Sequence, residues 1–222
     1  GDGGLAALAG VPLDGSRLSF VGQSLGGILG ALYNAVSPDT TNVVLNAAGG
    51  RLPRIILTAP SFARQRAALL AGLAEQDIRP GTPAFDRFAG IAQWVLDPAD
   101  PANVAYRLTH PVDVGGVSAP NENRKALLQF IEGDQTVPNE TNLALVSAAN
   151  RELSPTPPSF GCQPPLFCYE FTERGDAFDE ATATPPTRHG FLLAPPEGAR
   201  GPALTAKAQT QVGTFVATGV LP

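Results

Sequence analysis

The sequence predicts an α/β fold with a mostly parallel sheet, on two observations. Short apolar segments typical of strands alternate along the chain with segments of helical periodicity, which is the pattern of an α/β protein. In addition, NVVLNAA at 42–48 is a continuous apolar run, as expected for a strand that helices cover on both faces. The chain has 222 residues, of which 43% are hydrophobic, so it can form a substantial core.

Strands and helices are expected in the following order. The strand candidates lie at 18–21, 42–48, 126–132 and 166–172. Helices are expected at 25–35, 61–76, 83–96, 140–149 and 202–217, where apolar residues recur at helical spacing. Asp100 is expected to cap a further short helix that has Pro101 in its first position.

Residues 49–111 are expected to form a helical insertion between the second and third strands. This region contains two amphipathic helix candidates and no strand candidate. The segments 1–48 and 112–222 are then expected to form the sheet core.

The charge and hydropathy of the chain argue against two classes of function. The net charge is −5, the pI is about 5.0, and no cluster of Lys or Arg is present. Nucleic acid is therefore not an expected partner, because phosphate binding needs a basic surface. No apolar run approaches the ~20 residues of a transmembrane helix.

The sequence lacks methionine, so we expect a mature or trimmed piece of a longer precursor.

Cys162 and Cys168 are the two cysteines of the chain and lie in the segment CQPPLFC. A structural zinc needs four ligands, and neither a second cysteine pair nor a nearby histidine is present. A local disulfide is the better interpretation, with two buried free thiols as the alternative. A disulfide would indicate an exported protein.

The segment FVGQSLGGILG at 20–30 contains the pattern Gly-x-Ser-x-Gly between a strand candidate and a helix candidate. This is the context of a nucleophile elbow, a sharp turn that holds a serine in a strained backbone conformation. Gly22 and Gly26 are expected where side chains would collide as strand and helix close up. The Ser24 hydroxyl would then face substrate, and the N–H of Leu25, at the helix start, could stabilise an oxyanion.

A serine nucleophile needs a base, and the sequence contains two histidines, His110 and His189. Hydrolases with this elbow order their triad as serine, acid, histidine. His189 satisfies this order with Asp134 in between. His110 would need Asp97 or Asp100 as its acid and would leave the second half of the chain without a role. We therefore favour His189 and interpret His110 as a surface or interface histidine.

Asp134 directly follows the strand candidate ALLQFIE, in the segment GDQTVP. Functional groups collect where parallel strands end, at the carboxyl edge of the sheet. The Asp134 carboxylate could there orient His189 and stabilise its imidazolium form. Glu132 is a rival that we assign to the strand, and Asp176 and Asp179 are rivals in the loop before the histidine.

Taken in order, VGQSLGG, IEGDQTVPN and TRHGFLL resemble the α/β-hydrolase superfamily, and within it the bacterial extracellular lipase and esterase branch. The segment DPADPAN is a further similarity to that branch. The resemblance implies that Ser24, Asp134 and His189 act as nucleophile, acid and base on carboxylic esters, through an acyl-enzyme and without a metal or cofactor. It also implies that residues 49–111 form a cap over the acyl site. The protein is then expected to be secreted or extracellular, including the periplasm and the cell surface.

The chain departs from this family before the elbow. Family members carry several strands there, together with the second N–H of the oxyanion hole. We therefore expect this chain to be the C-terminal portion of a larger enzyme, completed by its missing N-terminal half or by a second copy. An open sheet edge would otherwise be a liability.

Other functions stay open beside the hydrolysis of an ester or lipid. A catalytically silent fragment of the fold could serve as a binding or assembly domain, because loss of one oxyanion donor costs on the order of 10²–10³ in rate. A peptidase or thioesterase would share the triad and differ only in the pocket.

Overall fold

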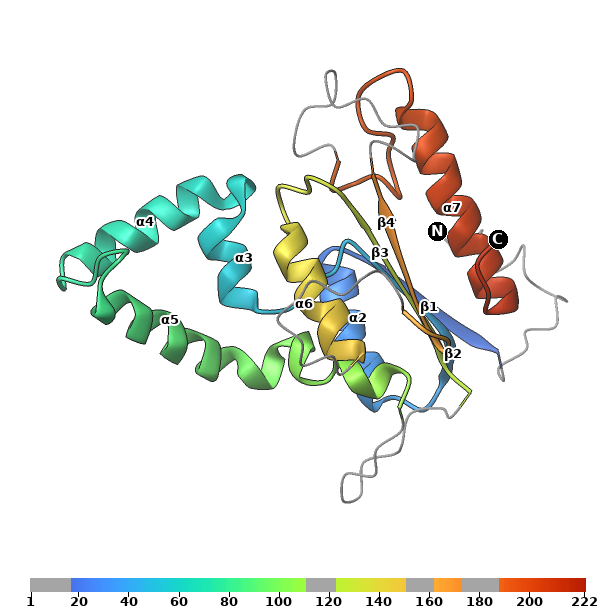
Figure 1. The fold of residues 1–222 in the computed structure, drawn as a ribbon, viewed down its shortest axis with the longest axis horizontal. Coiled ribbons are helices and arrows are strands. Elements are labelled where there is room, and N and C mark those ends of the chain that lie inside the picture. Colours follow the sequence, from blue (N-terminus) through green and yellow to red (C-terminus); the bar gives the residue numbers. More distant parts are fainter. Residues whose placement is uncertain (1–16, 111–122, 151–161, 173–187) are drawn as a thin grey trace, which may run out of the picture.

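The computed structural model describes residues 17–110, 123–150, 162–172 and 188–222 (Figure 1). At its centre lies a parallel sheet in the order β1-β2-β3-β4. The strands are β1 (Leu18–Gln23), β2 (Thr40–Asn46), β3 (Lys125–Ile131) and β4 (Leu166–Phe171). The prediction of an α/β fold with a parallel sheet is confirmed.

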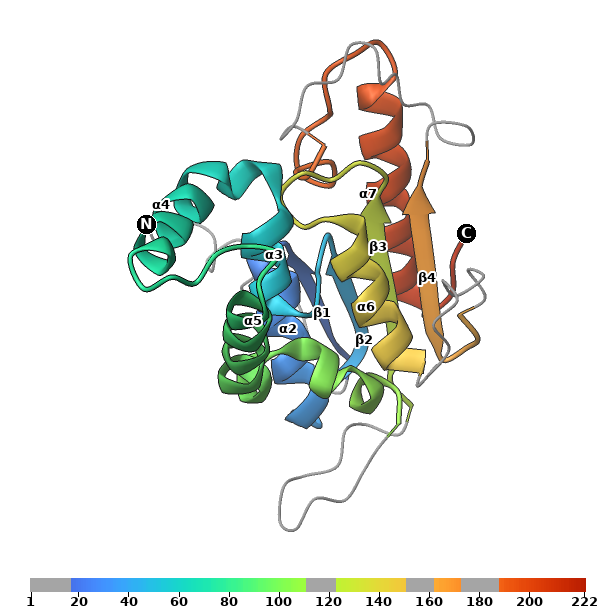
Figure 2. The same cartoon turned by 60° about the vertical axis from the view of Figure 1, so that its left-hand side comes forward.

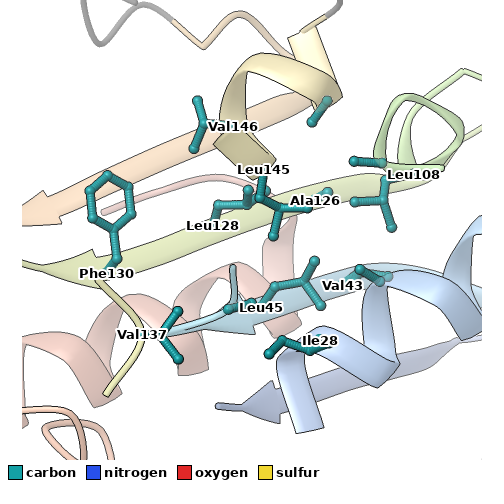
Figure 3. Close-up of a cluster of buried hydrophobic side chains, with 14 of the residues drawn as sticks. Ile28, Val43, Leu45, Leu108, Ala126, Leu128, Phe130, Val137, Leu145 and Val146 are labelled. Atoms are coloured by element: carbon teal, nitrogen blue, oxygen red, sulfur yellow. The ribbon is translucent and has the colours of Figure 1, made fainter. Parts of the chain in front are cut away.

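Helices cover both faces of this sheet. α2 (Leu25–Val36) and α6 (Asn139–Asn150) lie on one face, and α7 (Gly201–Thr218) lies on the other (Figures 1 and 2). Successive side chains of a strand point to opposite faces, so each buried strand contributes to two layers of the core. Val43 and Leu45 pack with α2 and α6 in the larger cluster of Figure 3, whereas Val44 and Leu127 contact Phe215 of α7.

The region between β2 and β3 is helical. It comprises α3 (Leu52–Thr58), η1 (Pro60–Phe62), α4 (Ala63–Ala74), α5 (Pro83–Leu96), η2 (Asp97–Ala99), η3 (Pro101–Asn103) and η4 (Ala105–Leu108). α4 and α5 extend away from the sheet, and neither contains a buried residue (Figure 1). In contrast, Ala105 and Leu108 belong to the larger core cluster. The range 49–111 thus contains both projecting helices and a segment of the core.

Two details of this region differ from expectation. α3 was not expected, because RLPRIILT is too short to show a helical period. The apolar stripe of α5 does not pack into a core within the described residues, since Ile91, Trp94 and Val95 are 52%, 73% and 63% exposed.

Cys162 and Cys168 form a disulfide, with their Cα atoms 5.6 Å apart. The bridge connects the residues before β4 to the strand itself, and both cysteines pack against the larger core cluster. In the chain-entropy model, closing so short a loop stabilises the fold by about 2 kcal/mol. The predicted disulfide is confirmed. Within the described ranges, no helix is both long and apolar enough to span a bilayer.

Candidate active site

Ser24 lies at the turn between the end of β1 and the start of α2, in a backbone conformation that is unusual for a residue with a side chain. Its φ is 55° and its ψ is −122°. The Ser24 N–H donates to the carbonyl of Asn46 on β2 at 2.8 Å, and the Ser24 carbonyl accepts the N–H of Ile28 at 2.9 Å. Hydrogen bonds to the sheet and to the helix therefore hold the strained residue in place.

The two elbow glycines have different surroundings. A Cβ atom on Gly22 would lie 2.3 Å from the carbonyl oxygen of Gly26, so only glycine fits there. A Cβ atom on Gly26 would meet no atom within 4 Å. The expected collision occurs at Gly22, where the helix crosses the end of the strand, and does not occur at Gly26, which is exposed.

Asp134 lies in the turn that follows β3, and its side chain is completely buried. Gly133, at φ 71°, turns the chain at this point. Asp134 Oδ1 accepts the backbone N–H groups of Thr136 at 2.8 Å and Val137 at 3.0 Å. These two bonds fix the carboxylate and leave Oδ2 for another donor. β3 ends at Ile131, so the rival Glu132 lies in the turn and not in the strand as expected.

His189 joins the serine to the carboxylate, although the three residues are far apart in sequence. His189 Nδ1 lies 2.7 Å from Asp134 Oδ2, and His189 Nε2 lies 2.6 Å from Ser24 Oγ. Because a carboxylate only accepts hydrogen bonds, Nδ1 carries the proton and donates it. Nε2 then has a free lone pair, which accepts the hydroxyl proton of Ser24. The structure thus brings together the three predicted residues in a single hydrogen-bonded chain.

Leu25 is the first residue of α2, and its N–H consequently has no acceptor within the helix. This N–H lies at the positive end of the helix dipole, directly after the serine. The position is suited to a negative charge that develops on an oxygen next to Ser24.

Two polar residues that sequence reasoning missed support this arrangement. Gln23 Nε2 donates to the carbonyl of His189 at 2.9 Å and holds the histidine segment against the elbow. Asn139 bridges the turn after β3 that contains Asp134, here called the acid turn. It accepts the N–H of Gly133 and donates to the carbonyl of Ile131, both at 2.8 Å. Gln23 could have been suspected from its place in the elbow pattern, whereas no sequence signal marks Asn139.

The rival residues lie in other environments. His110 stacks on Tyr106 with ring centroids 4.0 Å apart, and its Nδ1 lies 3.0 Å from Thr109 Oγ1. Asp97 accepts side-chain bonds from Gln93 and Asn103, which lower the pKa of its carboxyl group. Asp176 and Asp179 lie outside the described residues.

A cavity of about 320 Å³ opens beside Ser24, and its wall is almost entirely apolar. It is lined by Ser24, Leu25, Ile28, Leu52, Pro53, Ile55, Ile56, Phe62, Leu96, Thr136 and Val137. The lining comes from the elbow, α2, α3, η1, the end of α5 and the acid turn. No charged side chain is among these residues.

The sequence matches no family model, and no curated protein is detectably similar to it. Solved structures do match the fold. The uncomplexed acylaminoacyl peptidase of Pyrococcus horikoshii has a TM-score of 0.53 at 12% identity, over 97% of this chain and 26% of that chain. A puromycin hydrolase has a TM-score of 0.52 at 16% identity, over 98% of this chain and 25% of that chain.

The chain has part of the α/β-hydrolase fold. It spans about a quarter of the length of these solved chains. In this fold the nucleophile elbow, the acid turn and the histidine loop meet at the carboxyl edge of the sheet, which is where Ser24, Asp134 and His189 lie.

Proposed function

We propose that this chain is a serine hydrolase that cleaves carboxylic esters through an acyl-enzyme on Ser24. The observation that carries the proposal is the hydrogen-bonded chain from Ser24 through His189 to the buried Asp134. A strained serine, a histidine in the tautomer that can accept its proton and a carboxylate that stabilises the imidazolium are the parts that acyl transfer requires.

The reaction would proceed in two halves. Ser24 Oγ attacks the ester carbonyl carbon as its proton moves to His189 Nε2, and the Leu25 N–H stabilises the resulting oxyanion. The tetrahedral intermediate then expels the alcohol, which takes the proton from His189, and leaves an ester on Ser24. Water, deprotonated by His189, attacks this ester and releases the carboxylic acid and free Ser24.

The apolar cavity supports an ester of an apolar acid as substrate. A dry cavity of about 150 Å³ holds a benzene molecule, so a volume roughly twice as large suits an acyl chain of medium length. The lining residues carry no charge that would bind a peptide terminus. The resemblance of the sequence motifs to extracellular lipases and esterases agrees with this substrate class.

A peptidase is the second candidate, because two of the matching solved structures are named as a peptidase and a puromycin hydrolase. Both enzyme classes use the same nucleophile, base and acid. They would differ in whether an amide or an ester is cleaved faster. A silent domain that only binds is a further alternative that the same experiment separates, and a thioesterase is another that a thioester substrate would separate.

We also propose that another segment of a longer polypeptide covers the outer edge of the sheet and provides the second oxyanion donor. β1 pairs with β2 alone in the described sheet, and Leu18 and Val21 on it are each 47% exposed. The neighbouring residues Leu25 and Leu29 of α2 are 63% and 55% exposed. The disulfide is compatible with secretion, which we propose as the location.

The function is tested with p-nitrophenyl esters of increasing acyl length, the matching p-nitroanilides and a fluorophosphonate probe. We expect the esters to be cleaved faster than the anilides and the probe to label Ser24, as located by mass spectrometry. Ser24→Ala and His189→Ala should lose activity by at least about 10³-fold. His110→Ala is the matched histidine control and should retain activity. Faster anilide cleavage would favour the peptidase, and absence of both labelling and turnover would favour the silent domain.

A further inference from the structure

Asp100 is a completely buried carboxylate that is not part of the proposed catalytic triad. Its side chain accepts four hydrogen bonds from N–H groups. The donors are the backbone of Arg51 at 2.9 Å, the backbone of Leu52 at 2.8 Å, the backbone of Ala102 at 3.0 Å and the side-chain amide of Gln93 at 2.9 Å. The bond from Ala102 is the local cap that the sequence predicts, whereas the others come from elsewhere in the chain.

The bonds from Arg51 and Leu52 fix the start of α3. Arg51 has a left-handed backbone at φ 58° and ψ 59°, a conformation that needs outside support in a residue with a side chain. The adjacent Gly50 is packed closely as well, because a Cβ atom there would lie 2.7 Å from the Cβ of Ala102. The direction in which α3 leaves the core is therefore set by the segment around Asp100.

The bond from Gln93 fixes the end of α5 at the same point. Gln93 Nε2 contacts both Asp100 and Asp97, 2.9 Å from each. Gln93 lies one helical turn before Leu96, the last residue of α5. A single carboxylate thus binds two helices that bury little of their surface, since α5 contains no buried residue and α3 only one. α3 is also held to α6, because Arg54 and Thr58 both donate to Glu140.

These two helices form one side of the apolar cavity beside Ser24. Leu52, Pro53, Ile55 and Ile56 come from α3, and Leu96 comes from α5. Asp100 itself is not part of the lining. The Asp100 carboxylate therefore affects the shape of the cavity indirectly, by fixing the positions of α3 and α5.

We propose that Asp100, together with Gln93, is a positioning residue that sets the shape of the acyl cavity and so the acyl length that the enzyme prefers. This inference rests on the proposed function, because it takes the cavity as the acyl site. An acetyl group is too short to fill the cavity, so acetyl esters would depend little on the position of its lining. An octanoyl chain would extend along the apolar lining, to which α3 and α5 contribute, so its binding would depend on where those helices lie.

The test compares Asp100→Asn with wild type on p-nitrophenyl acetate and octanoate esters. Asparagine keeps the shape of the side chain but replaces one acceptor oxygen with an NH₂ group, which faces a backbone N–H. We expect the octanoyl-to-acetyl ratio of kcat/KM to fall by at least about tenfold, through a higher KM for the octanoyl ester. The acetyl parameters should stay within about twofold of wild type. Asp77→Asn, at a 94% exposed side chain of the same region, is the matched control and should leave the ratio unchanged.

A purely structural role of Asp100 would lower turnover of both esters equally, and that result, or an unchanged ratio in the folded variant, would overturn the inference. Folding is checked by circular dichroism and thermal melting. Should Asp100→Asn not fold, Gln93→Leu replaces it, and an unchanged ratio in that folded variant overturns the inference as well.

Binding of free octanoate, measured by calorimetry, separates this inference from the proposed function because it needs no catalysis. We expect wild type to bind octanoate and Asp100→Asn, or Gln93→Leu in its place, to bind it at least about tenfold more weakly. Wild type that binds octanoate but cleaves no ester would contradict the proposed function alone. Wild type that does not bind octanoate, or a variant that binds it equally well, would overturn the inference.

Discussion

Asp134→Asn should abolish most of the hydrolytic activity while leaving the fold intact. The carboxylate uses Oδ1 for the N–H groups of Thr136 and Val137 and Oδ2 for His189 Nδ1. Asparagine has only one oxygen and must choose between these partners. If the oxygen stays with the backbone, the NH₂ group faces Nδ1, which must then accept a hydrogen bond. Nε2 would carry the proton and could no longer receive the proton of Ser24.

The size of the loss in kcat can be estimated from the other orientation of the asparagine side chain, in which its oxygen faces His189. A flipped asparagine would keep His189 in its productive tautomer but would leave two N–H groups near the buried side chain without an acceptor. Each costs about 1–3 kcal/mol, or about 2–6 kcal/mol together. At 1.36 kcal/mol per factor of ten, the productive orientation is populated in roughly one molecule in 30 to one in 3 × 10⁴. We expect kcat to fall by a similar factor.

The assay is the steady-state hydrolysis of p-nitrophenyl butyrate at neutral pH, together with a thermal melt. Asp134→Asn should melt close to wild type, because the backbone bonds of its turn are retained. Asp39→Asn, in the turn between α2 and β2, is the control and should be fully active. A folded Asp134→Asn variant with activity within threefold of wild type would refute the proposed role of His189 and Asp134.

Two further predictions concern the elbow and the sheet. Gly22→Ala should cost about 1–3 kcal/mol of stability and most of the activity, because its Cβ would lie 2.3 Å from a carbonyl oxygen. Gly26→Ala should retain activity and melt no lower than wild type, since alanine favours a helix and its Cβ meets no atom within 4 Å; equal loss in both variants would contradict this contrast. Burial, and then the nearby charge of Glu132, raise the pKa of the Glu170 carboxyl group. A raised pKa makes the native state bind its proton more tightly, so the ionised group destabilises the fold above the ordinary glutamate pKa. Glu170→Gln should therefore raise the melting temperature at pH 7 and not at pH 3, and a gain of the same size at both values would contradict the stated cause.

Much of the candidate site could be predicted, because short sequence patterns identify its reactive residues. Ser24 was expected from a pattern of five residues between a strand and a helix, and Asp134 from its place after a strand. His189 followed from the order of the triad. The structure adds that these residues, separated by 55 and 165 positions from His189, lie within hydrogen-bond distance of one another.

The supporting residues could not be predicted in the same way. Asn139 and Gln23 are ordinary polar residues whose partners are carbonyl groups in other turns. The glycine pattern also gave a partly misleading picture, because it treats Gly22 and Gly26 alike. Only the crossing of strand and helix shows that one of them is packed and the other is open.

The sequence is sufficient to predict most helices and strands, though not α3, and the identity of the reactive groups, because helix period, strand hydropathy, caps and turns depend on neighbours a few residues apart. It predicted the cap that Asp100 gives to Ala102. The tertiary structure decided that the same carboxylate also binds the start of α3, nearly fifty positions earlier, and the side chain of Gln93. It also decided that Leu52 and Leu96 meet Ser24 around one apolar cavity. Such contacts depend on how packed elements face each other across the core, and no local pattern records that.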